Sequence, residues 1–227
     1  LRSMSISFHP LSLADRLLIQ EKVHPTESRN CDLNFMNLFS WRFLYDTEVA
    51  FHADWLLFRF KANGHTAYMA PVGNGNWNNI LAELLDDATV GGHPFLMLGV
   101  CENTLTHLEQ AMPGYFYATA DRNFTDCIDL RISLSTFSGK KLQAKRNFAN
   151  RFAKLYADYS YHPLTPDHFD ECLELDALWE KLKAETNETG SYTYQAEKQS
   201  LQNVFNHWQE LNGQGGILRV NGQIVAF

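Results

Sequence analysis

Two Asn-Gly pairs constrain the fold of this chain more than any other feature of its sequence. Asn63-Gly64 and Asn221-Gly222 each lie between two short runs rich in apolar residues. Asn and Gly readily adopt the positive φ angles of a two-residue hairpin turn, so each pair predicts two antiparallel strands. The chain therefore contains at least two β-hairpins, which lie far apart in the sequence.

Elsewhere the apolar residues recur every three or four positions, which is typical of amphipathic helices. Helices are expected near residues 12–23, 32–43, 76–87, 105–112, 140–156, 165–183 and 194–211. Further strands are expected near residues 49–52, 95–100, 115–119, 127–130 and 159–164. Hairpins combined with strand–helix units predict an α+β or α/β architecture. We place a first domain over residues 1–157 and the start of a second over residues 158–227.

The charge distribution is uneven. The chain is 45% apolar and 20% charged, as expected of a globular protein, and its formal net charge is −7. That charge argues against a protein that coats nucleic acid with its whole surface. Residues 139–154, however, carry six Lys or Arg and no acidic residue. Setting these six charges aside leaves −13 for the rest of the chain, so one basic segment stands out from an acidic protein.

Several classes of protein are not indicated by the sequence. The longest run of apolar residues and glycine, 95–101, is far shorter than the roughly 20 residues of a membrane helix, and no secretory signal is evident. The nine histidines include no metal-ligand spacing, so we expect neither a metal site nor a permanently bound cofactor. The four cysteines are widely spaced, which predicts reduced, buried thiols in a cytoplasmic protein: Cys31, Cys101, Cys127 and Cys172.

The basic segment is predicted to be an amphipathic helix. At about 100° per residue its apolar arc, expected to face the core, contains Phe148, Ala149, Phe152, Leu155 and Tyr156. Lys141 and Lys145 lie at the N-terminal end of this arc, where ammonium groups are costly unless they meet anions. A helix N-terminus after a glycine turn suits a phosphate or carboxylate. The alternative is a solvated basic face whose lysines extend past the core.

A weaker phosphate-loop candidate lies at Gly73 and Gly75, between a predicted strand and a helix. Small residues at such a position let backbone N–H groups approach a phosphate at the positive end of the helix. The loop lacks a third glycine and a lysine, so it meets neither the dinucleotide nor the P-loop fingerprint. A plain turn with Asn76 as the helix N-cap is the favoured interpretation.

Three segments, 31–42, 68–73 and 139–152, resemble the phosphatidylglycerol lysyltransferase C-terminal-like family, and the resemblance extends over most of residues 30–227. Its most specific part is G-K-K-x-x-x-K-R-N-x-x-N-x-F, beginning at Gly139. The resemblance implies two tandem GNAT-like (acyl-CoA N-acyltransferase) repeats, in which the 216–227 hairpin would open the second. That second repeat is expected to be incomplete at Phe227.

The chain departs from the lysyltransferases in two respects. We expect no counterpart of their membrane-spanning flippase half. The GNAT pyrophosphate signature R/Q-x-x-G-x-G/A is also missing, because residues 70–75 keep the glycines without the leading Arg or Gln.

The resemblance implies a cytoplasmic acyl- or aminoacyl-transferase. It would move an acyl group from acyl-CoA or aminoacyl-tRNA to an amine or hydroxyl acceptor, with a base and an oxyanion hole that we expect beyond Phe227. The donor phosphate or an anionic group of the acceptor would be bound by Lys141, Lys145, Arg146, Asn147 and Asn150. Two alternatives stay open: a non-catalytic module that binds an anionic ligand, and an RNA-binding role with steep salt dependence. The acceptor and the oligomeric state are left open.

Overall fold

A computed structural model describes residues 5–26, 28–185 and 194–227 of the chain. It contains two compact units, one up to residue 126 and one from residue 127. Each unit has its own sheet and its own apolar core. The two units therefore meet after residue 126. The boundary expected at residue 157 separates two predicted repeats instead, and it stays a prediction.

The first unit is built on a six-stranded mixed sheet with the order β1-β2-β3-β4-β6, in which β5 also pairs with β3. Only the β4–β6 pairing is parallel. The strands are β1 (His9–Pro10), β2 (Glu48–His52), β3 (Trp55–Ala62), β4 (His65–Met69), β5 (Val72–Gly73) and β6 (Met97–Leu98). Asn63 and Gly64 join β3 to β4 with φ angles of 49° and 79°, which confirms the first predicted hairpin.

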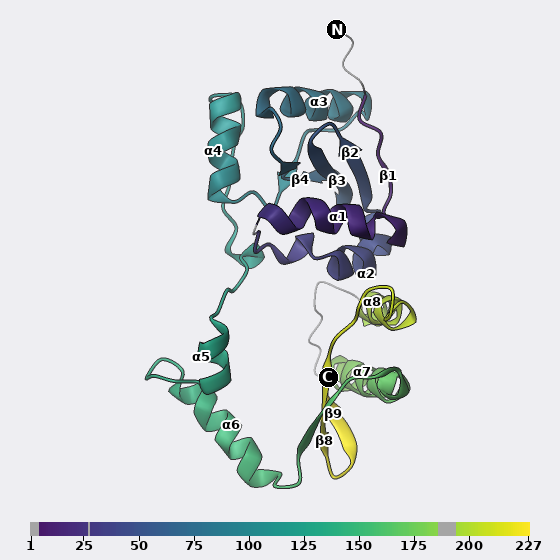
Figure 1. Ribbon diagram of the computed structural model, residues 1–227, viewed down its shortest axis with the longest axis vertical. Helices are drawn as coiled ribbons and strands as arrows, with labels where there is room; N and C mark the ends of the chain where they lie inside the picture. The colour runs from purple at the N-terminus through teal and green to yellow at the C-terminus, as the bar shows by residue number, and fades with distance from the viewer. Residues whose placement is uncertain (1–4, 27, 186–193) are drawn as a thin grey trace. The chain divides into compact units, whose positions relative to one another are not determined.

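Helices cover both faces of this sheet. Figure 1 shows α3 along one side of the sheet and α1 and α2 along the other. The helices of this unit are α1 (Arg16–Val23), α2 (Phe35–Tyr45), α3 (Trp77–Val90) and α4 (Glu102–Ala111). Short 3₁₀ turns occur at Leu13–Asp15, His24–Thr26, Cys31–Leu33 and Arg122–Phe124. Side-chain caps fix two helix starts, because Asn34 accepts from the backbone of α2 and Asn76 from that of α3.

Alternation along β3 builds the core on both faces of the sheet. Trp55 and Leu57 are buried on the face that packs against Ile80 and Leu84 of α3. Leu56 and Phe58, which are also buried, point to the opposite face, where α1 and α2 lie. Further along β3, the face toward α3 carries the polar side chains of Arg59 and Lys61, which form the polar end of the sheet.

The second unit contains a three-stranded antiparallel sheet with the order β7-β8-β9. Its elements are α5 (Arg131–Thr136), α6 (Gln143–Leu155), β7 (Ser160–Pro163), a 3₁₀ turn (Pro166–His168), α7 (Phe169–Glu185), α8 (Tyr194–Asn206), β8 (Gly216–Val220) and β9 (Gln223–Ala226). Asn221 and Gly222 again have positive φ angles, which confirms the second hairpin. In the core, Phe169 of α7 stacks on Phe205 of α8 with ring centroids 4.0 Å apart, beside Ile217 of β8.

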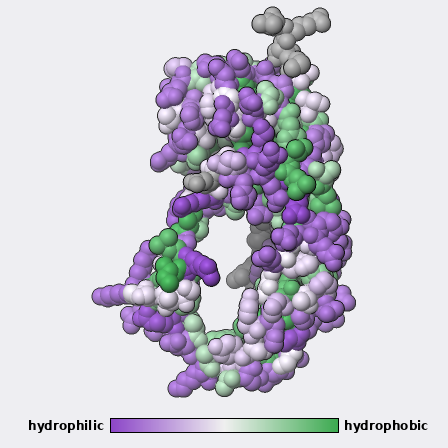
Figure 2. Space-filling model, in the orientation of Figure 1, coloured by the Kyte–Doolittle hydropathy of each residue, from purple (hydrophilic) through white to green (hydrophobic). Residues whose placement is uncertain are grey.

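Three sequence-based expectations are wrong. Residues 115–119 and 127–130 form no strands, because neither segment lies beside a strand that could satisfy its backbone groups. The apolar arc of α6 is not buried: Phe148 is 70% exposed and Leu155 is 62% exposed. Figure 2 shows apolar side chains at the surface over neighbouring α5 as well. Of the four cysteines only Cys172 is buried, because the others lie in loops or at helix starts.

Within the part of the chain that the structure describes, no helix combines the length and the apolar character needed to cross a membrane.

Candidate functional site

The basic segment forms a turn followed by α6, much as the sequence predicts. Lys140 and Lys141 lie in the turn, and the helix begins at Gln143. The predicted anion-binding side chains that are exposed to solvent are Lys141, Lys145, Asn147 and Asn150. The structure therefore brings these groups to the surface around the first two turns of α6, where a ligand could reach them.

Arg146 differs from its neighbours because it bonds to the chain itself. Its Nη1 donates to the carbonyl oxygen of Phe137 and, at 3.5 Å, to that of Gly139. Phe137 ends α5 with φ at 46°, and Gly139 follows with φ at 88°, so the backbone here is in the left-handed region that disfavours a bulky side chain. Arg146 therefore holds the unusual turn between α5 and α6. Nothing in the sequence pattern marked it for this role.

The cations of the basic segment have no acidic partners. Within residues 5–26, 28–185 and 194–227, no Lys or Arg between 139 and 154 forms an ion pair with Asp or Glu. The N-cap residue Leu142 offers no side-chain hydrogen bond to the first turn of α6. Uncompensated positive charge next to an uncapped helix N-terminus attracts anions such as phosphate or carboxylate.

The glycine loop is explained by packing. Gly73 has φ at 153°, and a Cβ placed on it would collide with the carbonyl oxygen of Asp54. A Cβ on Gly75 would collide with the indole ring of Trp55. The side chain of Asn76 accepts from the backbone N–H of Asn79 at 3.1 Å, so the N-cap of the plain-turn alternative is present. A phosphate-binding role for Gly73 and Gly75 stays a prediction.

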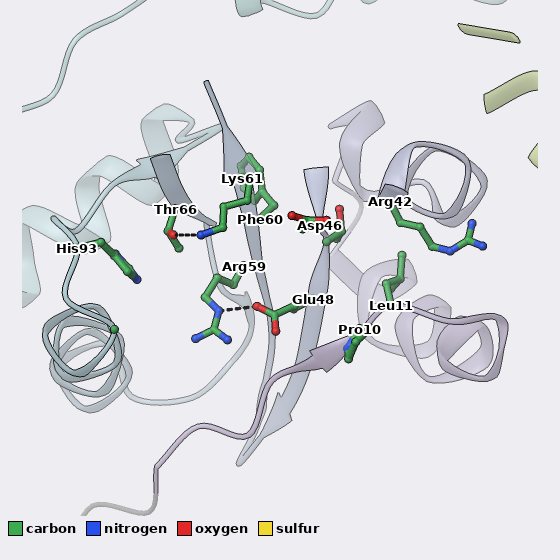
Figure 3. A pocket seen from close by; sticks show the side chains of 12 residues that line it. Pro10, Leu11, Arg42, Asp46, Glu48, Arg59, Phe60, Lys61, Thr66 and His93 are labelled. Carbon is green, nitrogen blue, oxygen red and sulfur yellow. Dashed lines mark hydrogen bonds and ion pairs between the residues drawn. The ribbon is translucent and has the colours of Figure 1, made fainter. Parts of the chain in front are cut away.

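A second candidate site, which the sequence did not indicate, is a pocket of about 560 Å³ in the first unit. It lies over the polar end of the sheet, next to the residues that follow α3 (Figure 3). Glu48 of β2, Arg59 and Lys61 of β3 and Thr66 of β4 line one side, and His93 lines another. The pocket brings charged groups of both signs together.

An ion-pair network borders this pocket. Arg59 donates from Nε to Glu48 at 2.7 Å and from Nη1 to Asp87 of α3 at 2.9 Å, and the hydroxyl of Tyr68 also donates to Asp87. Burial disfavours the Arg59 cation, but its hydrogen bonds to the carboxylates of Glu48 and Asp87 outweigh burial and raise the pKa of Arg59. Burial, and then the bond to Asp87, raises the pKa of Tyr68 well above its usual range.

The sequence did contain a signal for this network. With the β2–β3–β4 hairpins in place, Glu48 lies opposite Arg59 and Arg59 lies opposite Tyr68. Opposite charges at paired positions of neighbouring strands attract each other. The register that follows from the Asn63-Gly64 turn would therefore have pointed to a charge cluster, although not to the contribution of α3.

Two exposed thiols have opposite environments. The Cys31 thiol lies 3.2 Å from the Asp126 carboxylate, and its hydrogen bond to that group raises the Cys31 pKa to about 11. Cys101 is the N-cap residue of α4, and its hydrogen bond to Thr104, at 3.3 Å, lowers its pKa. Among the described residues, no group of three His, Cys, Asp or Glu side chains could hold a metal ion.

The fold resembles that of a solved lysylphosphatidylglycerol synthetase domain. The C-terminal domain of a putative lysylphosphatidylglycerol synthetase from Agrobacterium fabrum aligns with 94% of this chain at a TM-score of 0.55 and 15% identity. The aligned part spans 62% of that domain's chain. At this identity the likeness concerns the fold alone.

The family of the chain follows from its sequence. Residues 24–227 match the family described as "Phosphatidylglycerol lysyltransferase, C-terminal", and the chain belongs to this family, as the motif resemblance predicted. A conserved protein of unknown function from Bacteroides thetaiotaomicron VPI-5482 is 46% identical, with a TM-score of 0.90 over 97% of this chain and 73% of that chain. No curated protein matches the chain.

Proposed function

We propose that this chain is part of an acyl- or aminoacyl-transferase built from two tandem GNAT-like repeats. Membership of a family named for lysyl transfer to phosphatidylglycerol supports the reaction class. The mixed sheet of the first unit and the hairpin of the second are compatible with two such repeats. Two donors are proposed, aminoacyl-tRNA and acyl-CoA, and each would be a co-substrate rather than a bound cofactor.

The proposed reaction is an acyl transfer. An amine or hydroxyl of the acceptor attacks the carbonyl carbon of the donor's ester or thioester and forms a new amide or ester bond. The donor leaves as the free tRNA hydroxyl or the free thiol of CoA. A general base takes the proton of the acceptor, and the leaving group receives a proton in return. We assign neither the base nor the oxyanion-stabilising groups to residues of this chain.

The basic segment supports this proposal because both donors carry phosphates. The observation that carries it is the basic motif of the matched segment, whose exposed cations form no ion pair with Asp or Glu in the described part of the chain. Lys141 and Lys145 would supply charge, and Asn147 and Asn150 would donate neutral hydrogen bonds from the same helix. Arg146 would act mainly by positioning this surface, since it holds the α5–α6 turn.

The test measures donor binding and transfer with the full-length protein. We expect Lys145→Ala to weaken binding of aminoacyl-tRNA or acyl-CoA about tenfold or more, the scale of one charge-assisted contact. Lys154→Ala, which removes the same charge from the other end of α6, is the matched control and should change binding by less than about twofold. Equal donor binding by Lys145→Ala and wild type would contradict the role of this helix.

A non-catalytic, anion-binding module is the alternative function. One observation favours it for the first unit: Gly73 and Gly75 pack against Asp54 and Trp55 instead of presenting an open phosphate loop. Binding of a donor without transfer to any amine or hydroxyl acceptor would support this alternative, and turnover of any donor would eliminate it. An RNA-binding role through α6 would appear as a steep dependence of affinity on salt concentration.

A further inference from the structure

The pocket of the first unit contains hydrogen-bonding groups that the fold does not use. It is lined entirely by residues of that unit, and the proposed acyl transfer assigns it no role. Its polar wall includes side chains of β2, β3 and β4, namely Glu48, Arg59, Lys61 and Thr66 (Figure 3). We ask which kind of molecule could satisfy the remaining groups.

The unused donors belong to two cations. Lys61 Nζ donates one hydrogen bond, to the hydroxyl of Thr66 at 2.7 Å, although an ammonium group carries three donors. Arg59 uses Nε and Nη1 for Glu48 and Asp87 and stacks on the ring of Phe8, so within the described residues only its Nη2 is left for a further acceptor. Both side chains line the pocket, so an anionic group there could accept from them.

The unused acceptors belong to two carboxylates in the same pocket. Asp46, the C-cap residue of α2, is exposed, and its carboxylate makes no hydrogen bond or ion pair within the described residues. Glu48 engages Arg59 with Oε2, and its Oε1 has no partner in the described part of the chain. A cationic group in the pocket could therefore donate to either carboxylate.

The balance of charges selects the class of ligand. Arg42 also lines the pocket, but its guanidinium stacks on Phe39 and its Nη1 donates to the Phe39 carbonyl oxygen. Of the remaining charges, Asp46 and Glu48 would repel a purely anionic molecule, and Lys61 and Arg59 a purely cationic one. A molecule with one charge of each sign would find a partner for both. The pocket volume lies within the range typical of small-molecule sites, and Leu11 and Phe60 add apolar surface for a short side chain.

We propose that this pocket binds a compact zwitterion with the chemistry of a free α-amino acid. Its carboxylate accepts from Lys61 and Arg59, and its ammonium group donates to Asp46 and Glu48. This site is independent of the proposed transfer reaction, because none of its residues belongs to the basic segment.

The experiment compares three small probes of similar size on the full-length, ¹⁵N-labelled protein. L-alanine carries both charges, propionate only the negative one and propylamine only the positive one. We expect alanine to shift the backbone amides of residues 46–48, 59–61 and 93 in a saturable way, with at least about tenfold higher affinity than either single-charge probe. L-leucine and L-lysine then measure the room for a side chain.

Two variants and one control connect the binding to the pocket. Lys61→Met and Asp46→Asn remove the unpaired charges without touching the Arg59 network, and each should weaken alanine binding about fivefold or more. Asp54→Asn, in the β2–β3 turn at the far end of these strands, removes the same charge as Asp46→Asn outside the pocket and should leave binding unchanged. Circular dichroism and unchanged amide spectra elsewhere verify that the variants fold. The proposal is wrong if no amino acid shifts these amides at about 50 mM, or if propionate or propylamine binds as tightly as alanine.

Discussion

Two arginines, one in each unit, make hydrogen bonds in regions with opposite electrostatics. Arg59, in the first unit, meets two carboxylates and is only 24% exposed in its side chain. Arg146, in the second unit, bonds only to backbone carbonyls and lies among cations without acidic partners. The first arrangement ties strands to a helix. The second holds the α5–α6 turn and leaves the neighbouring positive charge without an acidic partner among the described residues, which favours the binding of an anion there.

The largest expected loss of stability follows from removing Arg59 from its two ion pairs. Replacing Arg59 with Met would leave Glu48 and Asp87 half-buried without their cation, and we expect a loss of about 3 kcal/mol in the free energy of unfolding. Urea denaturation followed by circular dichroism measures this loss. An unchanged unfolding midpoint would contradict a structural role for the network.

Two thiols also differ in the charge of their hydrogen-bond partner, which is a carboxylate for Cys31 and a hydroxyl for Cys101. Because the Asp126 carboxylate raises the pKa of Cys31 to about 11 and the pKa of Cys101 is lowered, Cys101 has the larger thiolate fraction of the two. We expect iodoacetamide to alkylate Cys101 at least about tenfold faster than Cys31. Peptide mass spectrometry at timed quenches reads each site separately. Asp126→Asn should increase the rate at Cys31, and equal rates in the wild type would refute the assignment.

The hydrogen bond from Tyr68 to Asp87 provides a second test of the Arg59 network. Tyr68→Phe removes its hydrogen bond to Asp87, and we expect a loss of about 1 kcal/mol of stability at neutral pH. The pKa of Tyr68 is raised in the folded state, so its contribution is full below the unfolded value of about 10 and declines as the pH rises above it. Urea denaturation between about pH 8 and 11 should therefore show the difference between wild type and variant shrinking. A constant difference across this range would be inconsistent with the raised pKa.

The smallest effects are expected in the basic segment, where two neighbouring cations should behave differently. Arg146→Ala loses the bonds to Phe137 and Gly139 and should cost about 1 kcal/mol, with faster hydrogen exchange in residues 137–142. Lys145→Ala loses no such bond and should leave stability unchanged within about 0.5 kcal/mol. Similar destabilisation by both substitutions would mean that Lys145 has a structural partner.

Local rules in the sequence predicted much of the fold. Both Asn-Gly hairpins form, because these turns depend only on the φ preferences of two residues. The start of α3 is also local, since Asn76 caps its first turn. The strands expected at 115–119 and 127–130 depend instead on a neighbouring strand, which a pattern of alternating residues cannot supply.

The candidate sites also contain some features that the sequence predicts and others that only the folded structure shows. The sequence predicted the exposed cations of α6, because a run of basic residues on one helix is visible in one dimension. It could not predict that Arg146 turns back to Phe137, or that the apolar arc of α6 lies at the surface, since amphipathicity does not specify what covers a face. The pocket escaped detection because its groups come from β2, β3, β4 and α2, which only the folded sheet brings together.

Asp87 contacts both the ion-pair network and the segment that forms the His93 side of the pocket. Its side chain bonds Arg59 and Tyr68 on two strands, and its backbone carbonyl accepts from Gly91 at 2.8 Å, just before the wall that contains His93. The carbonyl oxygens of Ala88 and Thr89 also accept from His93 and Gly92, so the end of α3 connects this wall to the sheet. A molecule that enters the pocket meets a surface already rigid, and little of its binding free energy is lost to ordering the protein.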